Sequence, residues 1–96
     1  MAIVMANDAF QIPDDLNSRA RLIETAVKRR CRSLQVKLQE QHIEITGHAG
    51  RLEKEEKDAL KSLGISHSTY GTKLYKDEFE GLIKSLIKRG FIRSTR

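Results

Sequence analysis

The first regular pattern of apolar residues begins after Pro13 and has helical spacing. The apolar positions fall on one stripe: Leu16, Ala20, Ile23, Val27 and Leu34. A stripe with this spacing predicts an amphipathic helix. Pro13 suits the first turn of a helix, and Asp14 and Asp15 complement the positive end of the helix dipole. We therefore expect a basic amphipathic helix that starts near Asp14.

The spacing changes between residues 33 and 47, where apolar and polar residues alternate. The alternation runs through two short segments around the connector QEQH: Leu34, Val36 and Leu38, then Ile43 and Ile45. A period of two predicts strands, so we expect a small β-hairpin at 33–47. The connector has none of the usual turn residues, and a continuous helix from Asp14 to Thr46 is the alternative. Such a helix would be far longer than is typical of globular proteins.

Two further helices follow, and each ends at a glycine. Residues 51–63 are rich in good helix formers, and Gly64 is placed to end this helix in a left-handed conformation. Residues 76–89 predict a strong final helix that Gly90 stops. Its apolar stripe comprises Phe79, Leu82, Ile83, Leu86 and Ile87. Phe91, just beyond Gly90, is placed to fold back onto the last turn.

These elements predict a mainly α-helical fold in a single domain, residues 1–96, with a helix-turn-helix-like unit in its C-terminal half. Residues 1–12 are interpreted as a flexible arm and residues 91–96 as a basic tail. A helix, two strands and a helix in this order are similar to the αββα arrangement of small BON-type and KH-type modules, which makes a two-layer α+β fold the alternative. The run from Gly47 to Gly50 matches the Gly-x-x-Gly of KH modules. There the loop joins two helices, whereas here it would follow a strand.

Composition excludes several classes of protein. The single cysteine, Cys31, cannot form an internal disulfide, and no apolar run has the length of a membrane span. The start, MAIVMANDAF, lacks the pattern of a signal peptide, so we expect a cytoplasmic protein with no membrane partner. The three histidines lack the spacing of a metal site, and no nucleophile motif or glycine-rich phosphate loop is present. We therefore expect no enzyme activity, no metal and no cofactor.

Charge is concentrated in two regions of the chain. The net charge is +5, and residues 19–37 carry seven basic residues against Glu24 alone. From Lys73 to the end there are seven basic residues and three acidic ones. Such concentration favours a polyanionic partner, because neutralised phosphates release their counterions. A solvated basic face without a partner is the simpler alternative.

The segment SLGISHSTYG resembles the helix-turn-helix of bacterial DNA-binding regulators. Gly64 allows a positive φ at the corner, Ile65 can fill the space between two helices, and Ser66 can cap the second helix. The resemblance implies that this second helix reads the major groove. The chain departs from the family pattern at Leu60, where a small residue is expected. Gly71 would lie inside the recognition helix, at a cost of about 1 kcal/mol relative to Ala, and Lys73 would take a normally apolar place.

The resemblance also assigns the residues that contact DNA. The groove-facing positions are Ser66, His67, Ser68, Thr69 and Thr72, with Lys73 and Lys76 reaching the backbone. Phe91 and Ile92 are similar to the start of the wing in winged-helix regulators. The candidate phosphate anchors outside the motif are Arg29, Arg30, Arg32, Lys88, Arg89, Arg93 and Arg96.

The sequence thus predicts a small protein that binds double-stranded DNA, as a transcriptional regulator of bacterial, plasmid or phage type. Because one helix reads few base pairs, we expect it to act as a homodimer. The alternative is an adaptor or inhibitor without enzyme activity that docks an acidic protein partner through its basic face.

Overall fold

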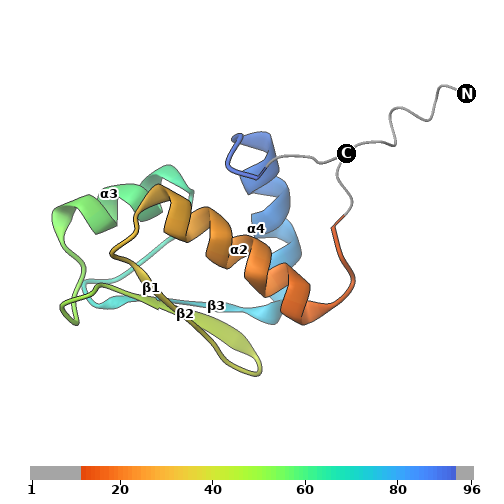
Figure 1. Ribbon diagram of the computed structural model, residues 1–96, viewed down its shortest axis with the longest axis horizontal. Helices are drawn as coiled ribbons and strands as arrows, with labels where there is room; N and C mark the ends of the chain where they lie inside the picture. The colour runs from red at the N-terminus through yellow and green to blue at the C-terminus, as the bar shows by residue number, and fades with distance from the viewer. Residues whose placement is uncertain (1–11, 93–96) are drawn as a thin grey trace, which may run out of the picture.

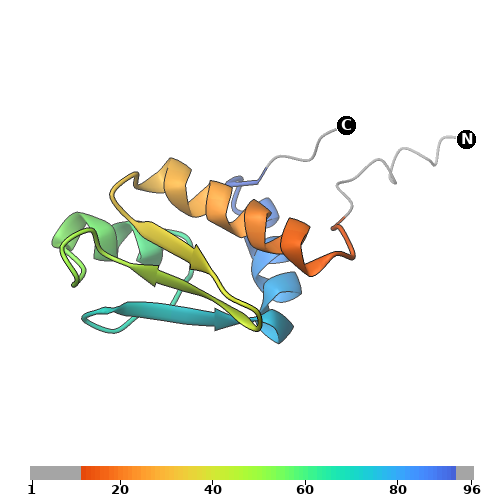
Figure 2. The same ribbon diagram turned by 60° about the horizontal axis from the view of Figure 1, so that its bottom comes forward.

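The structure is a computed structural model that describes residues 12–92. Its elements follow one another as α2 (Leu16–Arg30), β1 (Gln35–Leu38), β2 (His42–Thr46), α3 (Lys54–Ser62), β3 (Gly71–Tyr75) and α4 (Lys76–Lys88) (Figure 1). The strands form one antiparallel sheet in the order β1-β2-β3. Helices α2 and α4 cover one face of this sheet (Figure 2), and within the described residues no helix covers the other face.

Helix α2 confirms the first predicted helix, although it starts at Leu16, so that Pro13 and Asp14 precede its first turn. The carboxylate of Asp15 accepts hydrogen bonds from the backbone N–H and the hydroxyl of Ser18, both at 2.9 Å, and so caps the first turn. The bond from the Ser18 N–H, and to a lesser degree the bond from its hydroxyl, hold the pKa of Asp15 below its usual value. Ala20, Ile23 and Val27 of the predicted stripe are buried.

The hairpin predicted for residues 33–47 is present. Val36 pairs with Ile45, and Leu38 pairs with Ile43. Ile43 and Ile45 on the central strand are fully buried, and they form the middle of the core between the sheet and the helices. The turn closes through a 2.9 Å hydrogen bond from the Gln39 N–H to the His42 carbonyl, although it has no glycine or proline.

The corner at the end of α3 has the geometry that the sequence predicts. Gly64 has a φ of +77°, and its N–H donates to the Lys61 carbonyl at 3.0 Å. The N–H of Ile65 donates to the Leu60 carbonyl at 2.9 Å, which completes a Schellman motif. Ile65 is 4 % exposed and fills the space under the corner, as expected.

The segment beyond this corner is not a helix, so the predicted recognition helix starting at Ser66 is wrong. Residues 65–70 form a loop, and β3 follows, with Gly71 opposite Thr46 on β2. Gly71 has a φ of +141°, and a Cβ there would clash with the carbonyl oxygen of Ile45. The two strands approach closely at a residue that has no side chain. The glycine that is unfavourable in a recognition helix is the residue that permits this sheet.

Helix α4 begins where β3 ends. The Glu78 carboxylate accepts the Tyr75 N–H at 3.4 Å, which belongs to a capping box at its start. Phe79, Ile83 and Leu86 of the predicted stripe are buried against the sheet and α2.

The last helix ends at Gly90, which has a φ of +86°. The N–H of Phe91 donates to the Leu86 carbonyl at 2.8 Å, and the Phe91 side chain packs on the core, so the predicted fold-back is confirmed. Phe91 and Ile92 form no strand, so the start of a wing is wrong for these described residues. Arg93 and Arg96 lie outside the described residues, as does nearly all of the arm predicted for 1–12.

The expected mainly α-helical class is also wrong, because the fold is α+β. The alternative order αββα describes the first four elements, and β3 and α4 complete the fold. The run Gly47–Gly50 joins β2 to α3 in a turn closed by a 3.1 Å hydrogen bond from the Gly50 N–H to the Gly47 carbonyl. It therefore joins a strand to a helix, unlike the loop of KH modules.

Alanine substitutions at two glycines test this fold. We predict that Gly71→Ala destabilises the domain by about 1–3 kcal/mol, because the side chain would be strained and would push β3 from β2. Gly81→Ala is the control: beyond its chain neighbours and the local backbone of α4, no atom lies within 4 Å of the added Cβ, and helix propensity predicts a gain of about 0.5–1 kcal/mol. Urea unfolding measures both. A stabilised Gly71→Ala would contradict the strand and support a helix at this position.

Candidate nucleic-acid interface

The loop between α3 and β3 is held in place by hydrogen bonds at the end that leads into β3. Ser68 donates its backbone N–H and its hydroxyl to the Gly71 carbonyl, at 2.8 and 3.1 Å, and its hydroxyl oxygen accepts the Tyr70 N–H at 3.3 Å. The Thr69 carbonyl accepts the Leu52 N–H at 2.9 Å, which ties the loop to the start of α3. These bonds fix the backbone of residues 68–71 at the edge of the sheet.

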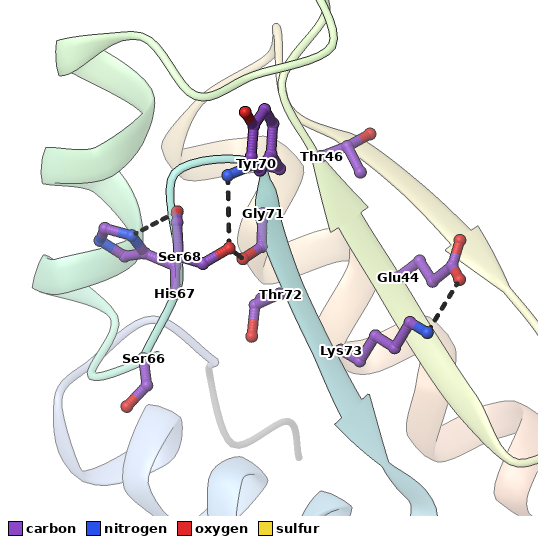
Figure 3. A pocket seen from close by; sticks show the side chains of 9 residues that line it. All are labelled: Glu44, Thr46, Ser66, His67, Ser68, Tyr70, Gly71, Thr72 and Lys73. Carbon is purple, nitrogen blue, oxygen red and sulfur yellow. Dashed lines mark hydrogen bonds and ion pairs between the residues drawn. The ribbon is translucent and has the colours of Figure 1, made fainter.

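Most of the groove-contacting residues predicted from the sequence lie around one pocket in front of β3. The pocket is open and has a volume of about 540 Å³ (Figure 3). Five of its lining residues were predicted: Ser66, His67, Ser68, Thr72 and Lys73. Thr69 and Lys76 do not line it, since Thr69 is bound through its carbonyl to Leu52 and Lys76 is the first residue of α4. The residues come together through a loop and a strand rather than through a helix.

Four further residues of this pocket were not predicted as contacts from the sequence, and one of them is Gly71. Tyr70 is 67 % exposed at its rim, and Glu44 and Thr46 are contributed by β2. The Glu44 carboxylate lies 4.0 Å from the Lys73 ammonium across the strands (Figure 3). The sequence signal that could have identified Tyr70 is its position as the aromatic residue of a polar segment, Ser66–Thr72. Glu44 and Thr46 depend on the register of β2 against β3, which no local pattern gives.

A second feature lies where the C-terminal ends of α2, α3 and α4 meet, and it involves three of the predicted phosphate anchors, Arg30, Lys88 and Arg89. Arg30 donates from Nε to the Ser62 hydroxyl at 2.8 Å. Arg89 donates from Nη1 to the Ser62 carbonyl at 3.4 Å and from Nε to the Ser85 hydroxyl at 3.1 Å. We call this site the basic corner, defined by Arg30, Arg89, Lys61 and Lys88. All four side chains belong to exposed residues.

The positive charge of the basic corner is not neutralised by carboxylates. Among the described residues, none of the ion pairs includes an arginine. Arg29 and Arg32, also predicted anchors, are exposed at the end of α2, and together with Arg30 they share a hollow with Glu55 and Asp58 of α3. The three arginines of this hollow outnumber its two carboxylates, and Lys61, Lys88 and Arg89 lie outside it. Helix C-termini carry partial negative charge, which favours basic side chains at this place.

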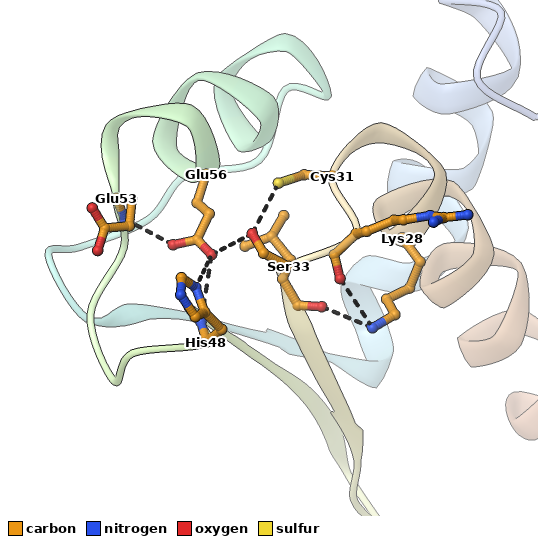
Figure 4. Close-up of polar contacts among 8 residues, drawn as sticks. Lys28, Cys31, Ser33, His48, Glu53 and Glu56 are labelled. Carbon is orange, nitrogen blue, oxygen red and sulfur yellow. Dashed lines mark hydrogen bonds and ion pairs between the residues drawn. The ribbon is translucent and has the colours of Figure 1, made fainter.

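A buried carboxylate, Glu56, is the strongest candidate for chemistry elsewhere in the described chain. It is 1 % exposed and accepts hydrogen bonds from the Ser33 hydroxyl at 2.6 Å, the Glu53 N–H at 2.8 Å and the His48 N–H at 3.4 Å (Figure 4). The His48 Nδ1 is 3.2 Å away. Burial raises the pKa of Glu56, but the bonds from Ser33, Glu53 and His48 outweigh it and lower the pKa to about 2.

Glu56 is therefore a structural residue. A carboxylate with a pKa of about 2 stays ionised near neutral pH and is a poor general acid or base. Its bonds join α3 to the start of β1 and to the turn after β2. Cys31 lies beside the same network, with its Sγ 3.3 Å from the Ser33 hydroxyl (Figure 4).

Residues 12–92 contain no group of three or more His, Cys, Asp and Glu side chains placed to hold a metal ion. Nor does this part of the chain contain a helix that is long and apolar enough to cross a membrane. No protein family model, curated protein or solved structure matches the chain.

The Glu56 network gives a stability prediction with a defined pH range. Because the folded pKa of about 2 lies below the ordinary value of 4.5, the stabilisation is complete above pH 4.5 and is lost as the pH falls toward 2. We predict that Glu56→Gln lowers the free energy of unfolding at pH 7 by about 1–3 kcal/mol. The variant should also lose stability less steeply than the wild type below pH 4.5.

Glu55→Gln, at an exposed position in the first turn of the same helix, is the matched control, since it removes the same charge near the helix dipole, and it should change both quantities much less than Glu56→Gln does. Denaturant unfolding at a series of pH values measures them. Equal effects of the two substitutions would show that the network around Glu56 does not stabilise the fold.

Proposed function

We propose that this domain binds nucleic acid and contacts its phosphates with the basic corner. The observation that carries the proposal is that Arg30 and Arg89, far apart in the sequence, both donate to Ser62. A guanidinium has five N–H donors, and these bonds use one from Arg30 and two, including the bond to Ser85, from Arg89. The other donors are free to bind phosphate oxygens in a fixed arrangement.

This proposal keeps the polyanionic partner that the charge distribution predicts and changes how it is bound. Phosphate contacts position a protein on nucleic acid, whereas base contacts give sequence specificity. The helix expected to enter the major groove does not form, so reading of bases must involve another surface. Regulation of transcription as a homodimer is part of the proposal, because one corner contacts few phosphates and a second copy doubles their number.

An acidic protein is the competing partner for the same corner. An exposed arginine pair without carboxylate partners attracts either polyanion. Nucleic acid is favoured because the pocket in front of β3, with its exposed Tyr70, continues the same surface. Aromatic rings at a basic surface suit bases.

The proposal predicts a steep salt dependence that depends on the corner. We expect the wild type to bind random-sequence DNA, and the double variant Arg30→Ala with Arg89→Ala to bind about tenfold more weakly at low salt. Each phosphate contact contributes about 0.9 to the slope of log K against log salt, so the slope should fall by about 2. Fluorescence anisotropy of labelled duplex and single-stranded DNA over a salt series measures both.

The matched control is the double variant Arg21→Ala with Lys84→Ala. It removes the same charge from the same two helices, and Arg21 lies about 14 Å along α2 from Arg30. Its affinity should stay within about twofold of the wild type, as expected for charges that make no phosphate contact. Absence of binding to any DNA at low salt, or equal weakening of both double variants, would refute the proposal. The first of these results would leave the acidic protein as the partner to test.

A further inference from the structure

The surface between the basic corner and the open face of the sheet is continuous. A hollow beside α3 runs from Lys61 and Gly64 to Ser66 and His67, and the opposite charges of Lys57 and Asp58 also line it. Ser66 and His67 also line the pocket in front of β3. At the other end, the Arg89 guanidinium lies against Gly64, where an added Cβ would be 3.0 Å from its Nη2. A flexible ligand that is bound at the corner can therefore follow this loop into the pocket.

The pocket presents an aromatic ring whose faces are accessible. Tyr70 is 67 % exposed, although the backbone beneath it is fixed by the bond from its N–H to the Ser68 hydroxyl (Figure 3). An exposed ring on a fixed backbone loses little freedom when it stacks on a planar ligand. Bases stack on such rings in single-strand binding proteins, whatever their sequence.

The remaining groups of the pocket suit the sugar and base of a nucleotide. Hydroxyl groups come from Thr46, Ser66 and Thr72, and they can donate to or accept from a sugar or a base edge. The Lys73 charge is offset by Glu44 at 4.0 Å, so the pocket itself has little excess charge. The excess of positive charge lies at the basic corner, where it would bind a phosphate. An acidic peptide would need the opposite arrangement, with cations inside the pocket.

We propose that this pocket takes one nucleotide of a single-stranded nucleic acid, with its base stacked on Tyr70 and the neighbouring phosphates directed toward the basic corner. The inference rests on the proposed function and names its ligand. A duplex fits less well, because its bases are stacked on one another and their faces are not available to Tyr70. The preference should therefore be for single strands over duplex.

The tyrosine content of the chain provides a specific readout. The sequence has two tyrosines and no tryptophan, so Tyr75→Phe leaves Tyr70 as the source of tyrosine fluorescence. Tyr75 lies at the far end of β3, beside His42 with ring centroids 5.4 Å apart, and does not line the pocket. Tyr70→Phe is therefore the matched control that reports on Tyr75 instead.

We expect an oligothymidylate of about twelve nucleotides to quench the fluorescence of Tyr75→Phe at saturation and to leave that of Tyr70→Phe nearly unchanged, after correction for its absorbance. Quenching in both variants, or in Tyr70→Phe alone, would overturn the assignment to this pocket. Thymidine monophosphate is tested in parallel. Quenching at similar concentrations of the mononucleotide would show a free-nucleotide site and overturn the single-strand proposal.

Affinity measurements complete the test. Tyr70→Ala should weaken binding of the labelled oligothymidylate about tenfold, whereas Tyr70→Phe keeps the ring and should stay within about twofold. Because Tyr70 is exposed, both variants should unfold at the wild-type temperature, which circular dichroism checks. If Tyr70→Ala binds as tightly as the wild type, the pocket proposal fails.

Failure of this inference is distinguishable from failure of the proposed function. Binding of duplex DNA that depends on Arg30 and Arg89 but not on Tyr70, with no preference for single strands, would overturn the inference and retain the function. Absence of binding to single strands and duplex alike at low salt would overturn both.

Discussion

The backbone of β3 approaches the backbone of β2 at Gly71 so closely that a side chain would meet the Ile45 carbonyl. This contact places β3 beside the central strand, and the rest of the arrangement depends on it. The loop of residues 65–70 must then cross from the end of α3 to the edge of the sheet. Helix α4 begins at the other end of β3 and packs beside α2, so that its C-terminus reaches Ser62 at the basic corner (Figures 1 and 2).

On the resulting surface, the positive charge of the basic corner and the exposed ring of Tyr70 lie at separate places. The basic corner has guanidinium groups that hydrogen bonds to Ser62 and Ser85 hold in place, and none of them pairs with a carboxylate among residues 12–92. The pocket in front of β3 has an exposed ring, several hydroxyls and a lysine whose charge Glu44 offsets. We propose that phosphates bind at the basic corner and bases in the pocket, and the hollow from Lys61 to His67 connects the two places. The buried Glu56 carboxylate stabilises the position of α3 against the hairpin through its hydrogen bonds to Glu53 and Ser33.

Local signals predicted the elements that local interactions determine. The apolar stripes of α2 and α4 and the glycines at 64 and 90 have their expected roles, because each acts within a few residues of chain. The hairpin was predicted from alternation alone. Strand β3 was not predicted, because the corner Gly64-Ile65-Ser66 can precede either a helix or a loop. The sequence analysis expected a helix, whereas a loop and β3 follow.

The signs against a recognition helix were present as Gly71 and Lys73, two departures from the helix-turn-helix pattern. Their meaning depends on β2, since Gly71 is required by the Ile45 backbone and Lys73 faces Glu44. For the same reason the sequence identified the basic residues but not which of them converge. The meeting of Arg30 and Arg89 at Ser62 is a product of tertiary packing. The spacing of residues along the sequence does not predict this contact.

Mapping of amide chemical shifts by NMR during titration with a single-stranded oligonucleotide tests the central claim most directly. The account predicts that changes concentrate at residues 61–73 and at the C-terminal ends of α2 and α4, with Arg30 and Arg89 among them. The first turn of α2 and the tip of the hairpin should not change. Changes confined to those two regions, or no changes at low salt, would contradict the proposal that this surface binds nucleic acid.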